Sequence, residues 1–261
     1  MKRTPAVIDP KDFPEELCEL LKEAKAYDSS SSMEARVYFI DKGAGCFMKV
    51  GEKGTLEREA LMDNYFNSLG IGAPVLNYLS SDKDYLLTEM VSGEDLTDGI
   101  YLSDGKWLAE KMGEVLRQLH EMRPIGCPVK DRVSEYLGLA EKNFRSGEYD
   151  NSAFPDSFGY RSAEEAYAFL KENEKILKSD TLIHGDFCLP NIIFKDKRLS
   201  GYIDLGNAGI GDRHIDIFWG AWTLFFNLRT DEFTDRFLDA YGRDRIDNLA
   251  LRTVAAAEVF G

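Results

Sequence analysis

The pattern of hydrophobic residues changes near residue 91, and this change most constrains the fold. Before it, short apolar runs predict four β-strands, at 36–40, 46–50, 74–79 and 85–91. Tight turns at 41–45 and 80–84 join consecutive strands, which makes the joined strands antiparallel. A helical pattern at 57–69 separates the two strand pairs. Residues 1–91 are therefore predicted to form a small antiparallel β-sheet lobe with one inserted helix.

The rest of the chain, residues 92–261, has mainly helical patterns. Leu108, Met112 and Val115 recur at helical spacing within a predicted helix at 106–123. Further helices are predicted at 14–27, 132–144 and 163–177, and two short strands at 192–194 and 201–203. The chain is therefore predicted to be α+β, with a second lobe that is larger and mainly helical.

The charge of the chain argues against two classes of partner. It has 32 Lys and Arg against 46 Asp and Glu, a formal net charge of −14. Nucleic acids and anionic membranes both attract basic surfaces, so neither partner is expected. An acidic surface suits a cationic small molecule, although solubility alone is the simpler explanation of the charge. We expect a monomer or a weak dimer.

Neither export nor membrane insertion is indicated. No apolar run approaches the roughly 20 residues of a membrane span, and residues 1–10 lack the apolar core of a signal peptide. The chain has four cysteines without a C-x-x-C pair and only three histidines, so it offers no zinc framework. We expect reduced thiols and a cytoplasmic protein.

Residues 182–206 are the most informative about function. An H-G-D tripeptide ends at Asp186, Asn191 follows five residues later, and a strand, a turn and a second strand lead to Asp204. A carboxylate such as Asp186 can accept or orient the proton of an attacking hydroxyl. Amide and carboxylate oxygens, as on Asn191 and Asp204, are hard ligands for Mg²⁺, which neutralises phosphate charge. The whole pattern predicts a phosphoryl-transfer site.

These residues make the chain resemble the aminoglycoside phosphotransferase family, and within it the 3′-O-phosphotransferases that act on kanamycin- and neomycin-type drugs. The resemblance covers nearly the whole chain. Besides the stretch above, it rests on Ser32–Tyr38, on Leu119-His120 followed by Cys127-Pro128, and on Gly211–Ile217. It implies the bilobal protein-kinase-like fold, ATP as cosubstrate and Mg²⁺ as metal. In this resemblance Asp186 is the catalytic residue, and Asn191 and Asp204 are the metal ligands.

The resemblance also implies phosphate-binding roles in the first lobe. Lys49 matches the lysine that contacts the α- and β-phosphates, and Glu59 matches its carboxylate partner. Glu57 is close enough in the sequence to be the alternative partner. Small residues can turn backbone N–H groups toward phosphate oxygens without a glycine repeat. The segment that replaces the glycine-rich loop of protein kinases contains Ser31, Ser32 and Met33.

The base of the nucleotide is expected at the hinge, residues 87–91. The Glu89 carbonyl and the Val91 N–H match the backbone groups that read adenine. Phe47 matches the aromatic residue that stacks on the base, and a core phenylalanine is the alternative interpretation.

Other matches concern the catalytic loop. Arg213 and Asp216 resemble residues that brace this loop, and His184 is expected to be structural rather than catalytic. One position departs from the family: many relatives carry arginine directly after the I-D-x-G segment, where this chain has Asn207.

Substrate contacts are expected from acids of the second lobe, because aminoglycosides carry several ammonium groups. Glu258 matches an acid near the C-terminus of the family, and the terminal carboxylate lies here on Gly261. Ala257 stands where relatives of the 3′ class have another acid, and Gly261 adds one residue, so this end departs from the family. Further candidates in the loop 146–162 are Glu148, Asp150 and Asp156, with a merely solvated surface as the alternative.

Three functions are compared. The first is an ATP-dependent kinase of the kanamycin kinase type, which phosphorylates the 3′-hydroxyl of an aminoglycoside and confers resistance. The second is a kinase of the same fold that acts on another metabolite alcohol, such as an amino sugar, choline or homoserine, and the altered C-terminus motivates it. The third is a catalytically silent nucleotide-binding module, against which the intact Lys49, Asp186 and Asn191 count. The sequence leaves the preferred substrate and the choice between ATP and GTP open.

Overall fold

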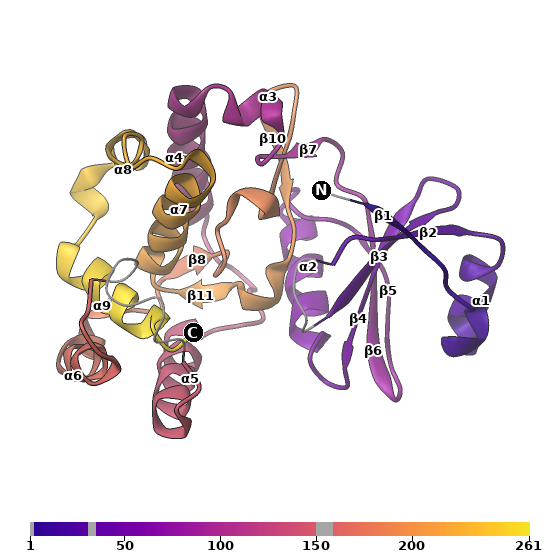
Figure 1. The fold of residues 1–261 in the computed structure, drawn as a ribbon, viewed down its shortest axis with the longest axis horizontal. Coiled ribbons are helices and arrows are strands. Elements are labelled where there is room, and N and C mark those ends of the chain that lie inside the picture. The colour runs from indigo at the N-terminus through magenta and orange to yellow at the C-terminus, as the bar shows by residue number, and fades with distance from the viewer. Residues whose placement is uncertain (1–2, 31–34, 150–158) are drawn as a thin grey trace. The chain divides into compact units, whose positions relative to one another are not determined.

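The computed structural model describes residues 3–30, 35–149 and 159–261 of the chain (Figure 1). These residues belong to two compact units. The first contains the chain up to Asp98 together with Pro190–Gly206, and the second contains Gly99–Leu189 and Asn207–Gly261. A segment from far along the sequence thus completes the first unit. The functional boundary expected at residue 91 stays a prediction.

A six-stranded antiparallel sheet dominates the first unit, in the order β1-β2-β3-β4-β6-β5. Its strands are β1 (Thr4–Ala6), β2 (Lys25–Asp28), β3 (Arg36–Asp41), β4 (Cys46–Glu52), β5 (Val75–Ser80) and β6 (Lys83–Glu89). Helix α2 (Glu57–Ser68) connects β4 to β5. The four strands and the inserted helix predicted from the sequence are confirmed.

The predicted helix at 14–27 is wrong in its second half. Helix α1 (Glu15–Leu21) ends early, and Lys25–Asp28 is strand β2. The helical spacing of Leu17 and Leu21 is real, and both side chains are buried. Ala26, however, pairs with Ile40 of β3 and is buried there. Without β2, the backbone N–H and C=O groups along this edge of β3 would have no partner in the sheet. Pairing with β2 satisfies them, so the tertiary context overrides local helix propensity.

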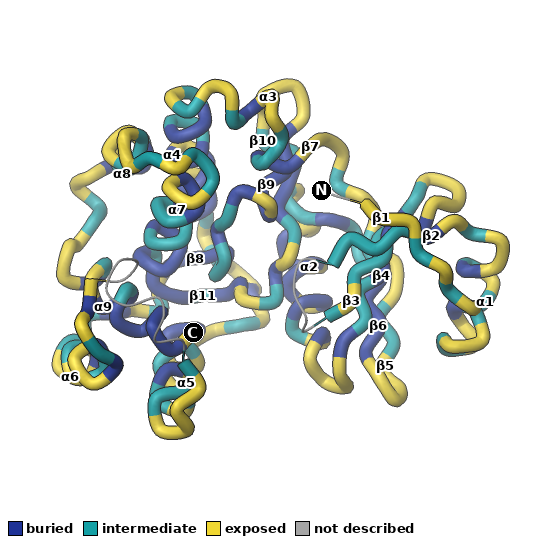
Figure 2. The backbone as a smooth tube through the Cα atoms, viewed as in Figure 1, coloured by how far each residue is buried: buried dark blue, intermediate teal, exposed yellow. Residues whose placement is uncertain are grey.

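Side chains alternate between the two faces of the sheet, and this alternation positions the site. Met48 of β4 and Leu87 of β6 pack with Leu17 of α1 in one buried cluster. The next residue in each strand points to the opposite face, where Leu86 packs with Leu56 and Ala60 beside α2. Figure 2 shows the buried centre of these strands. Lys49 pairs with Leu86 and therefore shares this second face.

A smaller sheet completes the first unit. Its strands are β7 (Glu94–Asp95), β9 (Ile192–Lys195) and β10 (Arg198–Tyr202), in the order β10-β9-β7. Strands β9 and β10 are the predicted strand–turn–strand, with β10 beginning at Arg198 rather than at residue 201. The backbone N–H of Ile203 donates to the carbonyl of Asn191 at 3.1 Å, which joins the two ends of this hairpin.

The second unit is mainly helical. Its helices are α3 (Gly99–Leu102), α4 (Gly105–Glu121), α5 (Arg132–Ser146), α6 (Ala163–Asn173), α7 (Arg213–Leu228), α8 (Thr234–Tyr241) and α9 (Asn248–Glu258). Strands β8 (Thr181–Ile183) and β11 (Gly209–Gly211) form a two-stranded sheet that the sequence analysis did not predict. Three-residue strands are too short to show a periodic pattern, and long-range pairing alone defines them.

Polar side chains cap the start of each long helix of this unit. The side chains of Asp104, Asp131 and Ser162 accept hydrogen bonds from the first turns of α4, α5 and α6. Asp212 and Asp247 do the same for α7 and α9. Such caps satisfy backbone N–H groups that have no partner within the helix, and each contributes about 1 kcal/mol.

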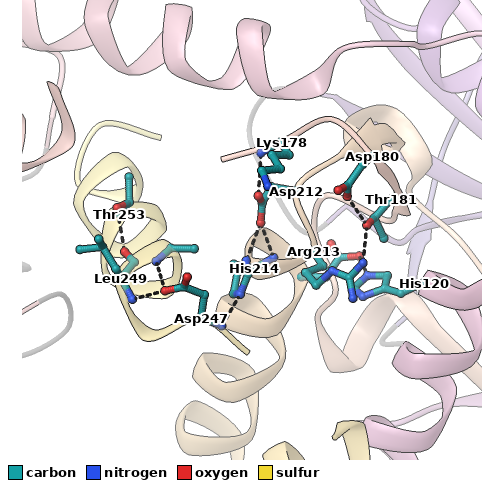
Figure 3. A network of polar contacts seen from close by, with 12 residues as sticks. His120, Lys178, Asp180, Thr181, Asp212, Arg213, His214, Asp247, Leu249 and Thr253 are labelled. Atoms are coloured by element: carbon teal, nitrogen blue, oxygen red, sulfur yellow. Dashed lines mark hydrogen bonds and ion pairs between the residues drawn. The ribbon is translucent and has the colours of Figure 1, made fainter. Parts of the chain in front are cut away.

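One buried histidine joins the starts of α7 and α9 (Figure 3). Its Nε2 accepts the backbone N–H of Asp247 at 2.9 Å, so Nδ1 carries the proton and donates to Asp212 at 2.6 Å. This residue is His214. Burial alone would raise the pKa of Asp212, but the hydrogen bonds from His214 outweigh burial and lower it. The carboxylate therefore stays ionised and holds α9 in place through the ring.

No helix among the described residues is long and apolar enough to cross a membrane.

Two glycines in helices should respond oppositely to alanine. A Cβ on Gly113 of α4 would lie 2.5 Å from the carbonyl oxygen of Phe237 in α8, whereas a Cβ on Gly138 of α5 would meet nothing within 4 Å. We expect Gly113→Ala to lower the free energy of unfolding by about 1–3 kcal/mol through overpacking. The control, Gly138→Ala, should raise it by about 0.5–1 kcal/mol. Urea unfolding measures both, and equal effects would contradict the close packing of α4 on α8.

Candidate active site

A pocket opens on the second face of the large sheet, within the first unit. Phe47 and Lys49 of β4 line it together with their cross-strand partners on β6, Thr88 and Leu86. The apolar part of the wall is completed by Val37, Ala73, Ile193 and Ile203. The polar residues that line it are Ser29, Lys49, Glu59, Asp63, Asn191 and Asp204, with Glu89 and Val91 also contributing. Apolar walls that meet a charged end suit a ligand with a flat apolar part and an ionic part.

Lys49 is the central charge of this pocket. Its Nζ donates to both carboxylate oxygens of Glu59, at 2.9 and 2.8 Å, and to Oδ1 of Asp204 at 2.7 Å. Burial by itself would lower the pKa of Lys49, but the two carboxylates outweigh burial and raise it. The ammonium therefore stays charged. Glu59, rather than the exposed Glu57, makes the contact.

Asp204 is held in an uncommon backbone conformation. Its φ of 60° lies in the left-handed region, which aspartate tolerates better than most residues. Asn191 lines the same pocket and is buried. One amide oxygen and one carboxylate are a donor set that fits Mg²⁺, which usually takes one or two carboxylates and completes its shell with water and substrate phosphates. No cluster of three or more His, Cys, Asp or Glu side chains suited to a metal occurs in the described parts of the chain.

Asp63 also lines the pocket, and the sequence analysis did not single it out. It lies one helical turn after Glu59 on α2, and only 4% of its surface is exposed. Burial raises the pKa of Asp63 well above its usual range, and the neighbouring Glu59 raises it further. Burial and the neighbouring carboxylate thus both disfavour a further negative charge at this position beside Lys49. The i, i+4 spacing from Glu59 in the predicted helix 57–69 was the signal that could have found it.

Phe47 packs against the ring of its cross-strand partner Phe39. The centroids of Phe39 and Phe47 are 5.3 Å apart. The guanidinium of Arg3 lies 3.7 Å from the Phe39 centroid and 5.5 Å from that of Phe47. These contacts fix the orientation of the Phe47 ring at the pocket wall. Glu89 ends β6, and its N–H donates to the carbonyl of Pro74.

In the second unit, the loop that carries Asp186 is held by one buried carboxylate. Asp216 of α7 accepts the backbone N–H groups of His184 and Gly185, both at 2.7 Å. It also accepts Nε2–H of His120 at 3.0 Å, and His120 Nδ1 forms a hydrogen bond with the Tyr241 hydroxyl at 2.9 Å. A buried carboxylate needs several hydrogen-bond donors, and Asp216 has three. The backbone of this loop is thereby held in place before Asp186.

The glycine of the H-G-D tripeptide is required by its surroundings. Gly185 has a φ of 84°, and a Cβ there would lie 2.0 Å from the carbonyl oxygen of Asn207. Asn207 itself is held by Arg132, whose Nε and Nη2 donate to its carbonyl and its side-chain oxygen at 3.0 and 3.3 Å. The residue that departs from the family is thus part of the packing around this loop. His184 Nδ1 accepts the N–H of Asp186 at 3.3 Å, a local tie in the same loop.

Glu258, at the end of α9, is a buried acid in the same unit. Its Oε1 accepts hydrogen bonds from the Tyr136 hydroxyl at 2.8 Å and from the Trp219 indole at 3.0 Å. Burial raises the pKa of Glu258 to about 7, and the negative charge of Asp186 contributes to the rise. Gly261 lies beside it, because a Cβ on Gly261 would be 3.0 Å from Oε2 of Glu258. Two acids and the end of the chain therefore share one region of the second unit.

The comparisons with known proteins agree on one family. Residues 29–252 match the model of the phosphotransferase enzyme family APH. A probable aminoglycoside 3′-phosphotransferase of Lactococcus lactis is 48% identical over 97% of this chain and 97% of its own length. This chain belongs to the aminoglycoside phosphotransferase family. The resemblance inferred from the sequence is confirmed.

Solved structures of the family share the fold of this phosphotransferase. A type VIII aminoglycoside 3′-phosphotransferase superposes with a TM-score of 0.73 at 22% identity and covers 99% of this chain and 94% of its own. An aminoglycoside phosphotransferase from Streptomyces rimosus, solved in complex with ADP and streptomycin, gives 0.68 at 23% identity, with 86% and 90% covered. The predicted α+β kinase-like fold is therefore confirmed.

The residues expected to contact ligands in this phosphotransferase are distributed unevenly over the structure. Lys49, Glu59, Asn191 and Asp204 come together in one pocket with Phe47, Glu89 and Val91. Five others lie outside the described residues: Ser31, Ser32, Met33, Asp150 and Asp156. Glu148 is exposed, and Ala257 is buried in an apolar cluster with Phe260. The roles of all these residues stay predictions.

Other expectations concern the scaffold. Asp216 holds the loop, as described above, while Arg213 donates to the Thr181 hydroxyl of β8 at 3.1 Å. The partners of Glu258 could not be predicted from local patterns, because Tyr136 and Trp219 lie in helices 122 and 39 residues before it. Their aromatic character alone is equally typical of core residues.

The stability of the phosphotransferase should depend on pH through Glu258. Its folded-state pKa of about 7 exceeds the ordinary value of 4.5, so the folded state binds more protons than the unfolded state between these pH values. Stability is therefore lost as pH rises through 7. Relative to wild type, Glu258→Gln should gain on the order of 3 kcal/mol between pH 4.5 and pH 8.

Urea unfolding of wild type and Glu258→Gln over this pH range measures the difference. Glutamine keeps an oxygen that can accept from Tyr136 and Trp219, so the comparison isolates the charge. A difference that stays constant with pH would show that Glu258 is ionised throughout.

Proposed function

We propose that this phosphotransferase transfers the γ-phosphate of ATP to the 3′-hydroxyl of a kanamycin- or neomycin-type aminoglycoside and thereby confers resistance to the drug. The observation that carries the proposal is the polar end of the pocket, where Lys49 is held between Glu59 and Asp204 with Asn191 beside them. This arrangement suits a triphosphate better than any neutral ligand. The 3′ position rests on the similarity to the relative from Lactococcus lactis.

Each residue of the pocket then has a defined task. The base lies between Phe47 and the apolar wall, with the backbone of Glu89 and Val91 as its polar contacts. Lys49 contacts the α- and β-phosphates and remains charged because of Glu59. Asn191 and Asp204 would hold Mg²⁺, which supplies charge neutralisation at the phosphates when bound.

Asp186 is the proposed catalytic residue. It accepts a hydrogen bond from the attacking hydroxyl and orients the oxygen toward the γ-phosphorus. The new P–O bond forms while the bond to the β-phosphate oxygen breaks, ADP leaves, and the hydroxyl proton passes to Asp186. Such a base contributes about 10²–10⁴-fold, and the rest of the rate comes from positioning and charge stabilisation.

The drug is a polycation, and the acids of the second unit are its proposed partners. Glu258, Asp150 and Asp156 would pair with its ammonium groups, and Gly261 would lie beside them. An ammonium beside Glu258 favours the ionised carboxylate, so binding of the drug near pH 7 releases a proton from this residue.

The remaining assignments complete the proposal. The nucleotide binds to the unit that contains Lys49, and the drug binds mainly to the helical unit. All four cysteines are free, which supports a cytoplasmic location, and a monomer or weak dimer is proposed. Neither nucleic acid nor a membrane is proposed as a partner.

Phosphorylation of another metabolite alcohol is the second candidate. It is favoured by Ala257, which is fully buried in an apolar cluster where relatives of the 3′ class carry an acid. The same assay that tests the first function separates the two, because a metabolite kinase releases ADP with choline, homoserine or an amino sugar and not with drugs.

Turnover with three drugs tests the proposed reaction. We expect ADP release with kanamycin and neomycin and none with tobramycin, which lacks the 3′-hydroxyl. Asp186→Asn should lower kcat by about 10²–10⁴-fold, because the base is lost while the shape is kept. Asp196→Asn, in the exposed turn between β9 and β10, is the matched control and should leave kcat unchanged. Equal turnover of tobramycin would exclude the 3′ position, and no turnover of any drug would refute the proposal.

Removing the central cation tests the nucleotide pocket. Lys49→Met should raise the Kd for ATP by a factor on the order of ten or more. The reason is that the phosphates lose their cationic partner and Glu59 loses its ion pair. Lys53→Met removes an exposed lysine and should have no effect. Calorimetric titration with ATP measures both. A Kd unchanged by Lys49→Met would place the triphosphate elsewhere.

A further inference from the structure

Helix α7 carries a row of aromatic side chains that have no role in the proposed reaction. The rings of Trp219 and Trp222 meet edge to face with centroids 5.3 Å apart. Trp222 and Phe226 are stacked, with centroids 4.9 Å apart and an interplanar angle of 12°. We call Trp219, Trp222 and Phe226 the aromatic row. The residues are three and four positions apart, so they follow one face of the helix over about 10 Å.

The first residue of the aromatic row, Trp219, packs against the core cluster that contains Val133 and Ile215, and exposure increases toward Phe226. Trp219 and Trp222 are half-buried, and Phe226 is 45% exposed. The buried face of α7 is a different one, formed by residues such as Ile217, Gly220 and Leu224. Exposed aromatic surface is unfavourable in water, and where several such rings are contiguous it is typical of a binding surface.

The row begins at the residue proposed to bind the substrate. The indole N–H of Trp219 donates to Glu258 at 3.0 Å, so the first ring of the row and the carboxylate are in direct contact. The neighbour of Trp222 in the sequence, Thr223, accepts the N–H of Leu189 at 3.2 Å, three residues after Asp186. The row therefore runs along the helix that holds both Glu258 and the end of the catalytic loop. All of these residues belong to the second unit.

The chemistry of the row indicates what it binds. Sugar rings have an apolar face of C–H groups that packs against aromatic side chains, while their hydroxyl and amino groups remain solvated. An ammonium group is a poorer occupant for the far end, because the guanidinium of Arg229 already lies 4.7 Å from the Phe226 centroid and would repel it. A neutral sugar face next to Trp222 and Phe226 is not repelled by Arg229 and covers the exposed aromatic surface.

We propose that the aromatic row binds the C–H face of a sugar ring of the substrate, beyond the ring that is phosphorylated. The proposal rests on the proposed function. With an ammonium group at Glu258, the continuing rings of the drug extend over Trp222 toward Phe226. Substrates with more than two rings thus gain affinity from the row, and the reacting ring does not contact it.

Two substrates that share their reacting rings test this inference. Neamine has two rings, and neomycin has the same two rings plus two further sugars. We expect Phe226→Ala to raise the KM for neomycin about fivefold and Trp222→Ala about tenfold, with kcat unchanged. The KM for neamine should change less than about twofold in both variants.

A neighbouring residue is the matched control. Phe225 is the next residue on α7, is 53% exposed and lies outside the row, so Phe225→Ala removes the same kind of side chain and should leave both KM values unchanged. Phe226 is exposed, so its variant keeps the fold even where Trp222→Ala is less stable. Circular dichroism checks this for every variant.

Fluorescence gives a measurement independent of turnover. The chain has three tryptophans, two of them in the row, so binding of neomycin should change the emission of the wild type more than binding of neamine does. This difference should disappear in Trp222→Phe and persist in Trp107→Phe.

The possible failures are distinguishable. Equal increases in KM for neamine and neomycin would overturn the inference and leave the proposed function intact. A row that instead pairs two copies of the chain would shift the sedimentation of Phe226→Ala without changing either KM, and this would also overturn it. If the wild type turns over neither drug, the proposed function fails. In that case an emission change on neomycin titration that is lost in Trp222→Phe still supports sugar binding by the row, and its absence overturns the inference as well.

Discussion

The ion cluster around Lys49 connects distant parts of the chain that line one pocket. Lys49 comes from β4, Glu59 from α2, and Asp204 from a segment that is 155 positions further along the chain. A buried ammonium is stable only with carboxylates close by, and the carboxylates likewise depend on the cation. The cluster therefore requires residues 190–206 to fold with the β-sheet, which explains why this segment belongs to the first unit. The raised pKa of Asp63 follows the same constraint, because burial and the neighbouring Glu59 both disfavour one more negative charge in this pocket.

In the second unit, buried polar groups hold the backbone of the loop that contains Asp186. Asp216 is fully buried and accepts two backbone N–H groups of the loop that contains Asp186, while His120 connects it to Tyr241. His214 plays a similar part at the start of α9 by linking Asp212 to the backbone of residue 247. In both cases an imidazole links a carboxylate to another element through its two ring nitrogens. These links hold the loop before Asp186 and the start of α9 in place.

The region around Glu258 combines an acid of raised pKa with aromatic side chains. Trp219 donates to this acid and begins the aromatic row, so charge recognition and ring stacking would start from the same point. Two positions near Glu258 that differ from the pattern of the 3′ class also lie in this region. Ala257 contributes to an apolar cluster, and the chain continues to Gly261 beside Glu258. A site with fewer acids and more aromatic surface would rely less on ionic pairing and more on the sugar rings themselves.

Sequence alone determined the class of fold, because strand patterns before residue 91 and helical patterns after it reflect which side chains must be buried. It also determined the reaction type, since Asp186, Asn191 and Asp204 lie in one short stretch whose residue types suit phosphoryl transfer. The strand at Lys25–Asp28 could not be predicted from local patterns, because it forms by pairing with the edge of β3. Only the tertiary structure decided between Glu57 and Glu59 as the partner of Lys49, placed Asp63 in the pocket and brought Trp219 to Glu258. The physical reason is the same throughout: burial and pairing depend on which residues meet across long sequence separations, whereas periodicity records only which residues share a face of their own element.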